Sequence, residues 1–143
     1  MTILVVGGGK MGMSHLALAT AYVGKANLAL CDSKFLTRLV FRLLGYRTVA
    51  NLDAAARLDR LEGVVIATPT SSHAALTRWA IERRVPVFVE KPLTLDPERS
   101  LELKRLAGEA GVPANVGFVM RHVASFQRLR HLVSTGALGR VTS

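Results

Sequence analysis

Six short apolar runs alternate with longer amphipathic stretches along the chain. The runs are rich in Val, Ile, Leu and Ala and mostly continuous, which is typical of strands covered on both faces of a parallel sheet. They occupy residues 3–6, 27–31, 47–50, 63–67, 85–89 and 114–119. Strands that alternate with helices indicate parallel pairing through right-handed crossovers. The expected fold class is therefore α/β: a doubly wound parallel sheet of the Rossmann type, in three α/β/α layers.

The stretches between the runs have helical periodicity. Helices are expected at residues 10–23, 34–44, 52–60, 72–84, 97–110 and 123–135. Asp96 followed by Pro97 is typical of a helix start, and Gly111 predicts the end of that helix. The helix at 34–44 carries an apolar stripe on one side and basic residues on another. That stripe consists of Phe35, Leu36, Leu39, Val40, Leu43 and Leu44.

Length, charge and cysteine content exclude several classes of protein. The 143 residues suit one domain with a real core, and the single cysteine, Cys31, excludes an intrachain disulfide. No metal site is expected. The N-terminus lacks a signal-peptide layout and no run is long enough to span a membrane, so we expect a cytoplasmic protein without a membrane partner. The net charge of +9 is spread over several segments without interleaved aromatics, so no nucleic-acid partner is expected.

The sequence GGGKMGMSH (residues 7–15) follows directly on the first apolar run and opens the first helix. Gly7, Gly9 and Gly12 satisfy G-x-G-x-x-G in the strand-to-helix context that indicates dinucleotide binding. Gly7 permits the tight turn, Gly9 lets a pyrophosphate approach the backbone, and Gly12 lets the helix pack closely on the strand. The helix N-terminus offers N–H groups to the phosphates. A plain glycine-rich turn is the alternative, and the motif places no demand on Gly8.

Asp32 lies at the end of the second run, about twenty residues after Gly12. A carboxylate there accepts hydrogen bonds from the adenosine ribose and repels a 2′-phosphate, which favours NAD(H). Ser33 and Lys34 come next and could hold a 2′-phosphate if Asp32 turned aside, so NADP(H) stays open. An N-cap role for Asp32 is compatible with cofactor binding.

Two further segments end strands at the edge where open α/β sheets bind ligands: IATPTSSHA (residues 66–74) and VEKPLTLD (residues 89–96). In the first, His73 is a lone histidine, for which a structural role is more frequent than a catalytic one. In the second, Lys91 closes a strongly apolar run and could lie over a cofactor ring to take part in proton transfer. An ordinary surface lysine is the alternative.

Taken together, these segments resemble the N-terminal domain of the Gfo/Idh/MocA oxidoreductases, the family of glucose–fructose oxidoreductase and inositol 2-dehydrogenase. The resemblance spans essentially the whole chain, and the EKP triplet is its most specific part. The matching segments are VVGGGKMGMSH, the pair CD at 31–32, ATPTSSH, VEKPLTLD, VGFVMR (116–121) and GALGRV (136–141).

The resemblance implies roles for particular residues. The lysine of EKP, here Lys91, reaches the nicotinamide and the substrate hydroxyl and is the expected catalytic residue. The Lys91–Pro92 peptide is expected to be cis. The TP turn lies beside the nicotinamide, and Arg121 lies near the active site. The expected cofactor-binding residues are Gly7, Gly9, Lys10, Met11, Gly12, Asp32, Ser33, Thr68, Pro69, Thr70, His73, Glu90, Lys91 and Arg121.

The chain departs from the family pattern after Arg121, where His122, Val123 and Ala124 replace an aromatic residue followed by Asn-Pro. The family also has a second, substrate-binding domain. We therefore expect a dinucleotide-binding domain at residues 1–120, and at 121–143 a connecting helix and the start of an absent domain, with a strand that opens near residue 140.

The expected function is the NAD(P)-binding part of an oxidoreductase that moves hydride between a nicotinamide and a CH–OH group of a sugar, polyol or sugar nucleotide. The chain alone is expected to be inactive and to form homo-oligomers only with the missing domain. A stand-alone nucleotide-binding or regulatory module is the alternative.

Overall fold

In the computed structural model, which describes residues 1–140 and 142, six parallel strands form one sheet. The strand order is β3-β2-β1-β4-β5-β6, so the chain starts in the middle, winds to one edge, and then crosses back to build the other half. The expected doubly wound α/β fold is confirmed. The strands are β1 (Thr2–Val6), β2 (Leu28–Cys31), β3 (Arg47–Val49), β4 (Leu61–Ile66), β5 (Val87–Val89) and β6 (Ala114–Val116).

Helices connect successive strands, as the periodicity predicts. The α-helices are α1 (Lys10–Val23), α2 (Phe35–Leu43), α3 (Leu52–Ala55), α4 (His73–Glu82), α5 (Pro97–Ala110) and α6 (Ala124–Ser134). Short 3-10 helices are η1 (Lys25–Asn27), η2 (Thr70–Ser72) and η3 (Val119–His122). The helix expected at 52–60 is wrong in length, because the chain turns after Ala55. Arg60 adopts a positive φ of 47°, which no helix accommodates, before β4 begins.

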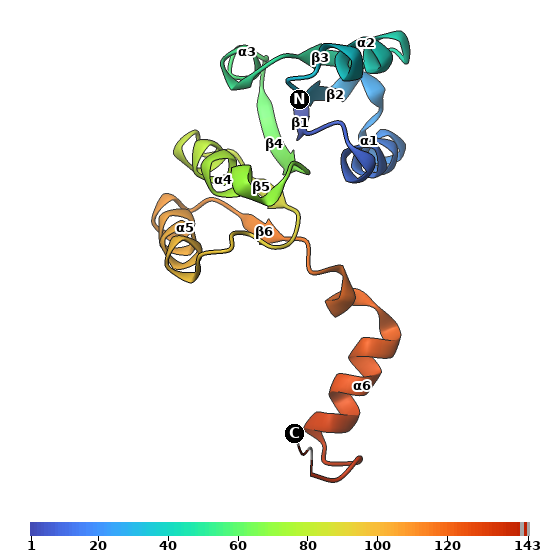
Figure 1. Cartoon of the computed structure of the whole chain (residues 1–143), viewed down its shortest axis with the longest axis vertical. Helices are drawn as coiled ribbons and strands as arrows, with labels where there is room; N and C mark the ends of the chain where they lie inside the picture. Colours follow the sequence, from blue (N-terminus) through green and yellow to red (C-terminus); the bar gives the residue numbers. More distant parts are fainter. Residues whose placement is uncertain (141, 143) are drawn as a thin grey trace.

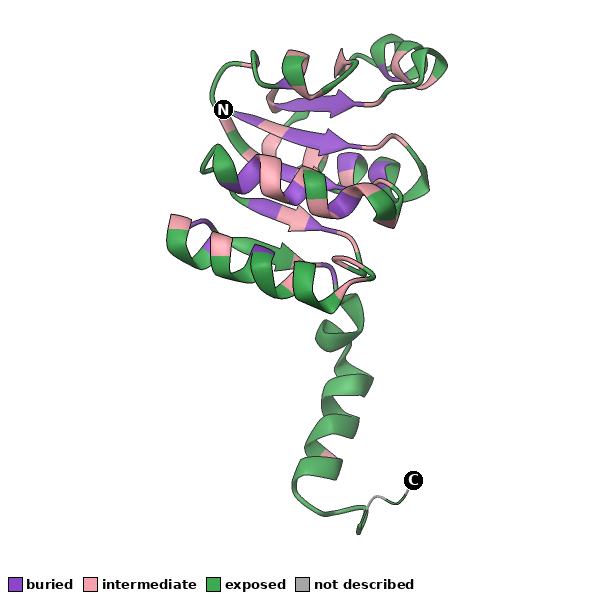
Figure 2. Ribbon diagram, turned by 60° about the vertical axis from the view of Figure 1, so that its left-hand side comes forward, coloured by how far each residue is buried: buried purple, intermediate pink, exposed green. Residues whose placement is uncertain are grey.

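Helices flank the sheet (Figures 1 and 2), and alternate side chains of the strands enter two separate cores, one on each face of the sheet. Val5 packs with Leu16 of α1 and Phe41 of α2 on one face. Its neighbours Leu4 and Val6 belong to the core under α4 and α5 on the other face. The three-layer arrangement follows from this alternation.

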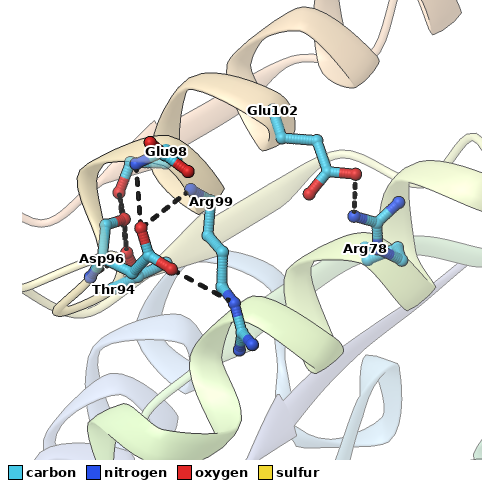
Figure 3. A network of polar contacts seen from close by, with 7 residues as sticks. Arg78, Thr94, Asp96, Glu98, Arg99 and Glu102 are labelled. Atoms are coloured by element: carbon cyan, nitrogen blue, oxygen red, sulfur yellow. Dashed lines mark hydrogen bonds and ion pairs between the residues drawn. The ribbon is translucent and has the colours of Figure 1, made fainter.

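Helix α5 begins and ends where the sequence predicts (Figure 3). The Asp96 side chain accepts hydrogen bonds from the backbone N–H groups of Glu98 and Arg99, and Gly111 closes the helix with φ of +65°. An ion pair of 2.7 Å joins Arg78 of α4 to Glu102 of α5. These contacts fix the two helices that cover the β4-β5-β6 half of the sheet.

In an ordinary surface helix the apolar side faces the protein, but in helix α2 most of the apolar side faces solvent. Its buried residue is Phe41, whereas the apolar stripe identified in the sequence faces outward. Leu36 is 74% exposed and Leu43 is 80% exposed. Burial of one aromatic ring therefore holds α2 on the sheet, and most of its apolar surface remains uncovered.

The C-terminal segment leaves the body of the domain (Figures 1 and 2). Helix α6 forms where the periodicity predicts it, and none of the residues of this described helix is buried. The expected strand near residue 140 falls partly on residues 141 and 143, outside the described residues. In the part of the chain that the structure describes, no helix combines the length and apolarity that crossing a membrane requires.

Candidate functional site

Three glycines shape the turn between β1 and α1, and each meets different surroundings. Gly7 has φ of +98°, and a Cβ there would lie 2.7 Å from the Ala67 carbonyl oxygen. A Cβ on Gly12 would lie 1.8 Å from the Gly7 carbonyl oxygen, so the helix touches the turn itself. A Cβ on Gly9 would meet no atom of the described residues within 4 Å. Close packing therefore requires glycine at positions 7 and 12, whereas Gly9 leaves open space beside the turn.

Gly8 is also required, although the G-x-G-x-x-G pattern leaves its position variable. A Cβ there would lie 2.4 Å from Cγ2 of Thr37 in α2. The Gly8 N–H donates a hydrogen bond of 2.7 Å to Oδ2 of Asp32. The sequence carries no signal for this, because both contacts come from residues more than twenty positions away. Gly8 thus joins the turn to the carboxylate at the end of β2.

The N-terminus of α1 opens onto a cavity of about 870 Å³. Gly9 is the N-cap, and in the described chain no side chain caps this end of the helix, whose first turn contains no acidic residue. Its N–H groups and the positive end of the helix dipole are therefore free for an anion. Lys10 and Met11 line the same cavity. These residues fit the pyrophosphate of a dinucleotide.

Asp32 lies in the same cavity with both carboxylate oxygens oriented by the backbone. Oδ2 accepts the Gly8 N–H and Oδ1 accepts the Lys34 N–H at 2.8 Å. The next residue, Ser33, also lines the cavity. A carboxylate retains further lone pairs, so Asp32 can still accept hydrogen bonds from ribose hydroxyls. Behind it, burial and the adjacent Asp32 carboxylate raise the pKa of the Cys31 thiol to about 11.

A second cavity of about 590 Å³ lies over the ends of β4, β5 and β6. Thr70, Glu90 and Lys91 line it. The Lys91–Pro92 peptide bond is cis, as the family resemblance implies. Both cavities are lined by Met11, Ala67, Thr68 and Pro69. The two cavities therefore form one trough along the carboxyl edge of the sheet, with Asp32 at one end and Lys91 at the other.

A hydrogen bond that the sequence did not reveal fixes the floor of the second cavity. His15 Nε2 of α1 lies 2.8 Å from Glu90 Oε1, and both side chains are largely buried. The His15 ring also packs edge-on against Phe88 of β5, with centroids 5.4 Å apart. His15 closes the run GGGKMGMSH, but only the fold brings it to Glu90, the residue next to Lys91.

His73 holds two loops together. Only 1% of the residue is exposed, and its ring nitrogens lie 2.8 Å from the carbonyl oxygens of Thr68 and Pro92. Both ring nitrogens therefore face a carbonyl acceptor of the protein. The ring is thus engaged with the protein, and this geometry supports the structural role for His73. It ties the TP turn to the EKP loop.

Arg121 is not brought to the trough. It lies in η3 and lines a separate hollow beside α6, together with Phe126 and Arg130. Its guanidinium stacks 4.6 Å from the centre of the Phe118 ring. Val119 and His122 of the same short helix line the second cavity, so η3 itself reaches the trough while Arg121 lines the separate hollow. The assignment of Arg121 to the cofactor site stays a prediction.

Comparison with known proteins shows the family to which the chain belongs. Residues 1–118 match the family model GFO_IDH_MocA, described as "Oxidoreductase family, NAD-binding Rossmann fold". The chain belongs to this family. The resemblance inferred from the EKP and glycine motifs is thereby confirmed, and so is the expectation that the domain binds NAD.

Curated relatives match over nearly the whole chain. Inositol 2-dehydrogenase 1 of Mycolicibacterium vanbaalenii is 37% identical over 142 residues, which are 96% of this chain and 41% of the relative. Inositol 2-dehydrogenase of Rhodococcus jostii is 33% identical over 144 residues, which cover 97% of this chain and 39% of the relative. The Gfo/Idh/MocA chain thus spans about two fifths of the length of the curated relatives it matches.

Solved structures agree with this fold. GenD2 from gentamicin A biosynthesis, in complex with NAD, superposes with a TM-score of 0.83 at 28% identity, over 96% of this chain and 40% of GenD2. The myo-inositol 2-dehydrogenase of Lactobacillus plantarum has the same fold, with a TM-score of 0.83 at 23% identity over 99% of this chain and 43% of that protein.

Proposed function

We propose that the trough binds NAD(H) in an extended conformation along the carboxyl edge of the sheet. The adenosine ribose binds at Asp32, the pyrophosphate crosses Gly9 and the N-terminus of α1, and the nicotinamide occupies the cavity that contains Lys91. The observation that carries this proposal is the junction of the two cavities at Thr68 and Pro69. That junction gives one continuous path between the two ends of the trough.

Preference for NAD(H) over NADP(H) is assigned to the Asp32 carboxylate. Its charge would lie beside the 2′ position of the ribose and would repel a 2′-phosphate. The nearest arginine, Arg38, is engaged elsewhere, because its Nη1 donates to the carbonyl oxygens of Asp32 and Ser33 at 2.8 and 2.7 Å. The backbone therefore already uses Arg38, and Lys34, which lines the same cavity, is the cation that remains for the 2′-phosphate of NADP(H).

Calorimetric titration with NADH and NADPH tests this assignment. We expect Asp32→Asn to weaken NADH binding by roughly tenfold and to reduce the difference between the two cofactors, because hydrogen bonds to a charged group contribute about 1.5–3 kcal/mol. Asp53→Asn, which removes an exposed carboxylate from α3, is the control and leaves both affinities unchanged. Equal affinity for both cofactors in the wild-type chain, unaltered in Asp32→Asn, would refute the role of Asp32.

For the whole protein, we propose an oxidoreductase that acts on a CH–OH group of a polyol or sugar. The names of the curated relatives support this substrate class, and their greater length supports a second domain beyond residues 121–143. When bound, the nicotinamide supplies hydride transfer to or from the alcohol carbon. Lys91 lies at the rim of that cavity and exchanges the hydroxyl proton, and the His15–Glu90 pair fixes the strand end that carries it.

Two observations test this larger proposal. Residues 1–143 alone should bind NADH but show negligible turnover of myo-inositol, since the substrate-binding groups would come from the second domain. The reading frame beyond residue 143 should continue for a further domain, and a stop codon there would favour a stand-alone regulatory module. We further propose a cytoplasmic location and assembly of the whole enzyme through the second domain.

A further inference from the structure

The outer face of α2 is an exposed apolar surface unrelated to the cofactor trough. We call it the α2 stripe, and it consists of Phe35, Leu36, Leu39, Val40, Leu43 and Leu44. Each of these side chains is at least 37% exposed. Phe41 and Thr37 face the opposite way, toward the sheet and Gly8. The helix is therefore amphipathic with its apolar face toward solvent, and an exposed apolar face of this kind is typical of an interaction site.

Charge is arranged around the stripe and not within it. The Arg38 guanidinium is bound to backbone carbonyls before α2, and Arg42 Nη2 lies 3.3 Å from Thr48 Oγ1 on β3. Both cations are thus held toward the sheet edge. Residues 33–50 contain no acidic residue. An uncharged centre with arginine at the rim is the composition of a protein–protein interface.

The exposed area of the α2 stripe is close to the area that each partner buries in a standard protein–protein interface. At these exposed fractions the six residues together expose on the order of 700 Å², close to the ~800 Å² that each partner buries in a standard interface. An exposed apolar patch above a few hundred Å² is uncommon on a monomer and marks an interaction site.

We propose that the α2 stripe binds the α2 stripe of a second copy of this chain in a two-fold symmetric dimer. An isologous contact needs a surface that is complementary to itself, and an uncharged helix face meets that need. In this arrangement each stripe covers the other, and the arginines stay at the rim, so like charges do not meet at the centre. The contact is separate from the assembly proposed through the second domain.

An anionic membrane is a weaker candidate for the same surface. A helix that lies in a lipid interface directs its cationic side chains toward the headgroups along the edges of its apolar face. Here the guanidinium groups of Arg38 and Arg42 are instead hydrogen-bonded to the protein at the sheet edge. The geometry therefore favours a second copy over a lipid surface.

Sedimentation velocity on the purified chain tests the proposal. The wild-type chain of 15.4 kDa should approach twice that mass as its concentration rises. Leu43→Glu should weaken dimerisation at least tenfold, because it buries an unpaired charge in the interface. Leu101→Glu is the matched control, since Leu101 is an exposed leucine of α5, and it should dimerise like the wild type. Phe126→Glu, in the exposed apolar face of α6, should also dimerise normally.

Three results would overturn the proposal. The first is a wild-type chain that stays at 15.4 kDa at ~100 µM, well above the micromolar range of a specific contact of this size. The second is a dimer lost in Phe126→Glu but kept in Leu43→Glu, which would assign the contact to α6. The third is a monomeric chain that co-sediments with phosphatidylserine vesicles and loses this binding in Leu43→Glu, which would assign the stripe to lipid. Unchanged NADH affinity in Leu43→Glu would show that the variant is folded and would leave the cofactor proposal unaffected.

Discussion

The lack of space for a Cβ at Gly12 predicts that Gly12→Ala will severely destabilise the domain. The new Cβ would lie 1.8 Å from the Gly7 carbonyl oxygen, whereas real Cβ atoms stay at least 3.0 Å from other heavy atoms. Because the obstacle is backbone, α1 would have to retreat from β1 by about 1.2 Å. Such a shift also loosens Leu16, which is almost fully buried in that core. Overpacking of this kind costs about 1–3 kcal/mol, and loss of the Leu16 packing places the expected value near 3 kcal/mol.

Urea unfolding followed by far-UV circular dichroism measures this cost. Two alanine variants serve as controls. Gly108→Ala, inside α5 with no described atom within 4 Å of the new Cβ, should stabilise the chain by about 0.5–1 kcal/mol. Gly9→Ala, equally open, should leave the fold intact but weaken NADH binding, since its methyl group occupies the space proposed for the pyrophosphate. A Gly12→Ala variant as stable as the wild type would refute the packing argument.

Three further predictions concern side chains around the site. His15→Phe keeps an aromatic ring against Phe88 but leaves Glu90 without its hydrogen-bond partner. The free energy of unfolding measured in urea titrations should therefore fall by about 1 kcal/mol. No change would mean that His15 and Glu90 do not interact. Because burial raises the pKa of Cys31 to about 11, its thiolate is scarce at neutral pH, and iodoacetamide should alkylate the native chain at least ~10-fold more slowly than the unfolded chain. Equal rates would show that the thiol is accessible. Asp96→Ala removes the cap of α5 and should lower the melting midpoint by an amount equivalent to about 1 kcal/mol, whereas an unchanged midpoint would show that the cap contributes nothing.

The fold was predictable because its signals are local. Continuous apolar runs mark strands buried on both faces, and Asp96-Pro97 and Gly111 mark the ends of a helix by their own backbone chemistry. Part of the glycine motif is also local, since Gly12 lies against the Gly7 carbonyl oxygen within the turn and Gly7 has the positive φ that the turn requires. Such features depend little on the rest of the chain.

The features that escaped prediction depend on distant residues. Gly8 is required by Thr37, and His15 meets Glu90 across 75 positions of sequence. The helical periodicity of 34–44 correctly gives an apolar stripe, yet periodicity alone does not say which side faces the sheet. Here Phe41 faces inward and the stripe faces outward. Arg121 was assigned by resemblance, and its role at the cofactor site stays a prediction.

The proposed position of NAD(H), along the trough from Asp32 to Lys91, can be followed by nuclear magnetic resonance. Backbone amide chemical shifts of the ¹⁵N-labelled chain are recorded during titration with NADH. We expect the signals of Gly8, Gly9 and Asp32 and those of Lys91 and Gly117 to shift with one common saturation curve, while that of Gly108 in α5 stays unchanged. Shifts confined to one end of the trough, or centred on α5, would contradict it.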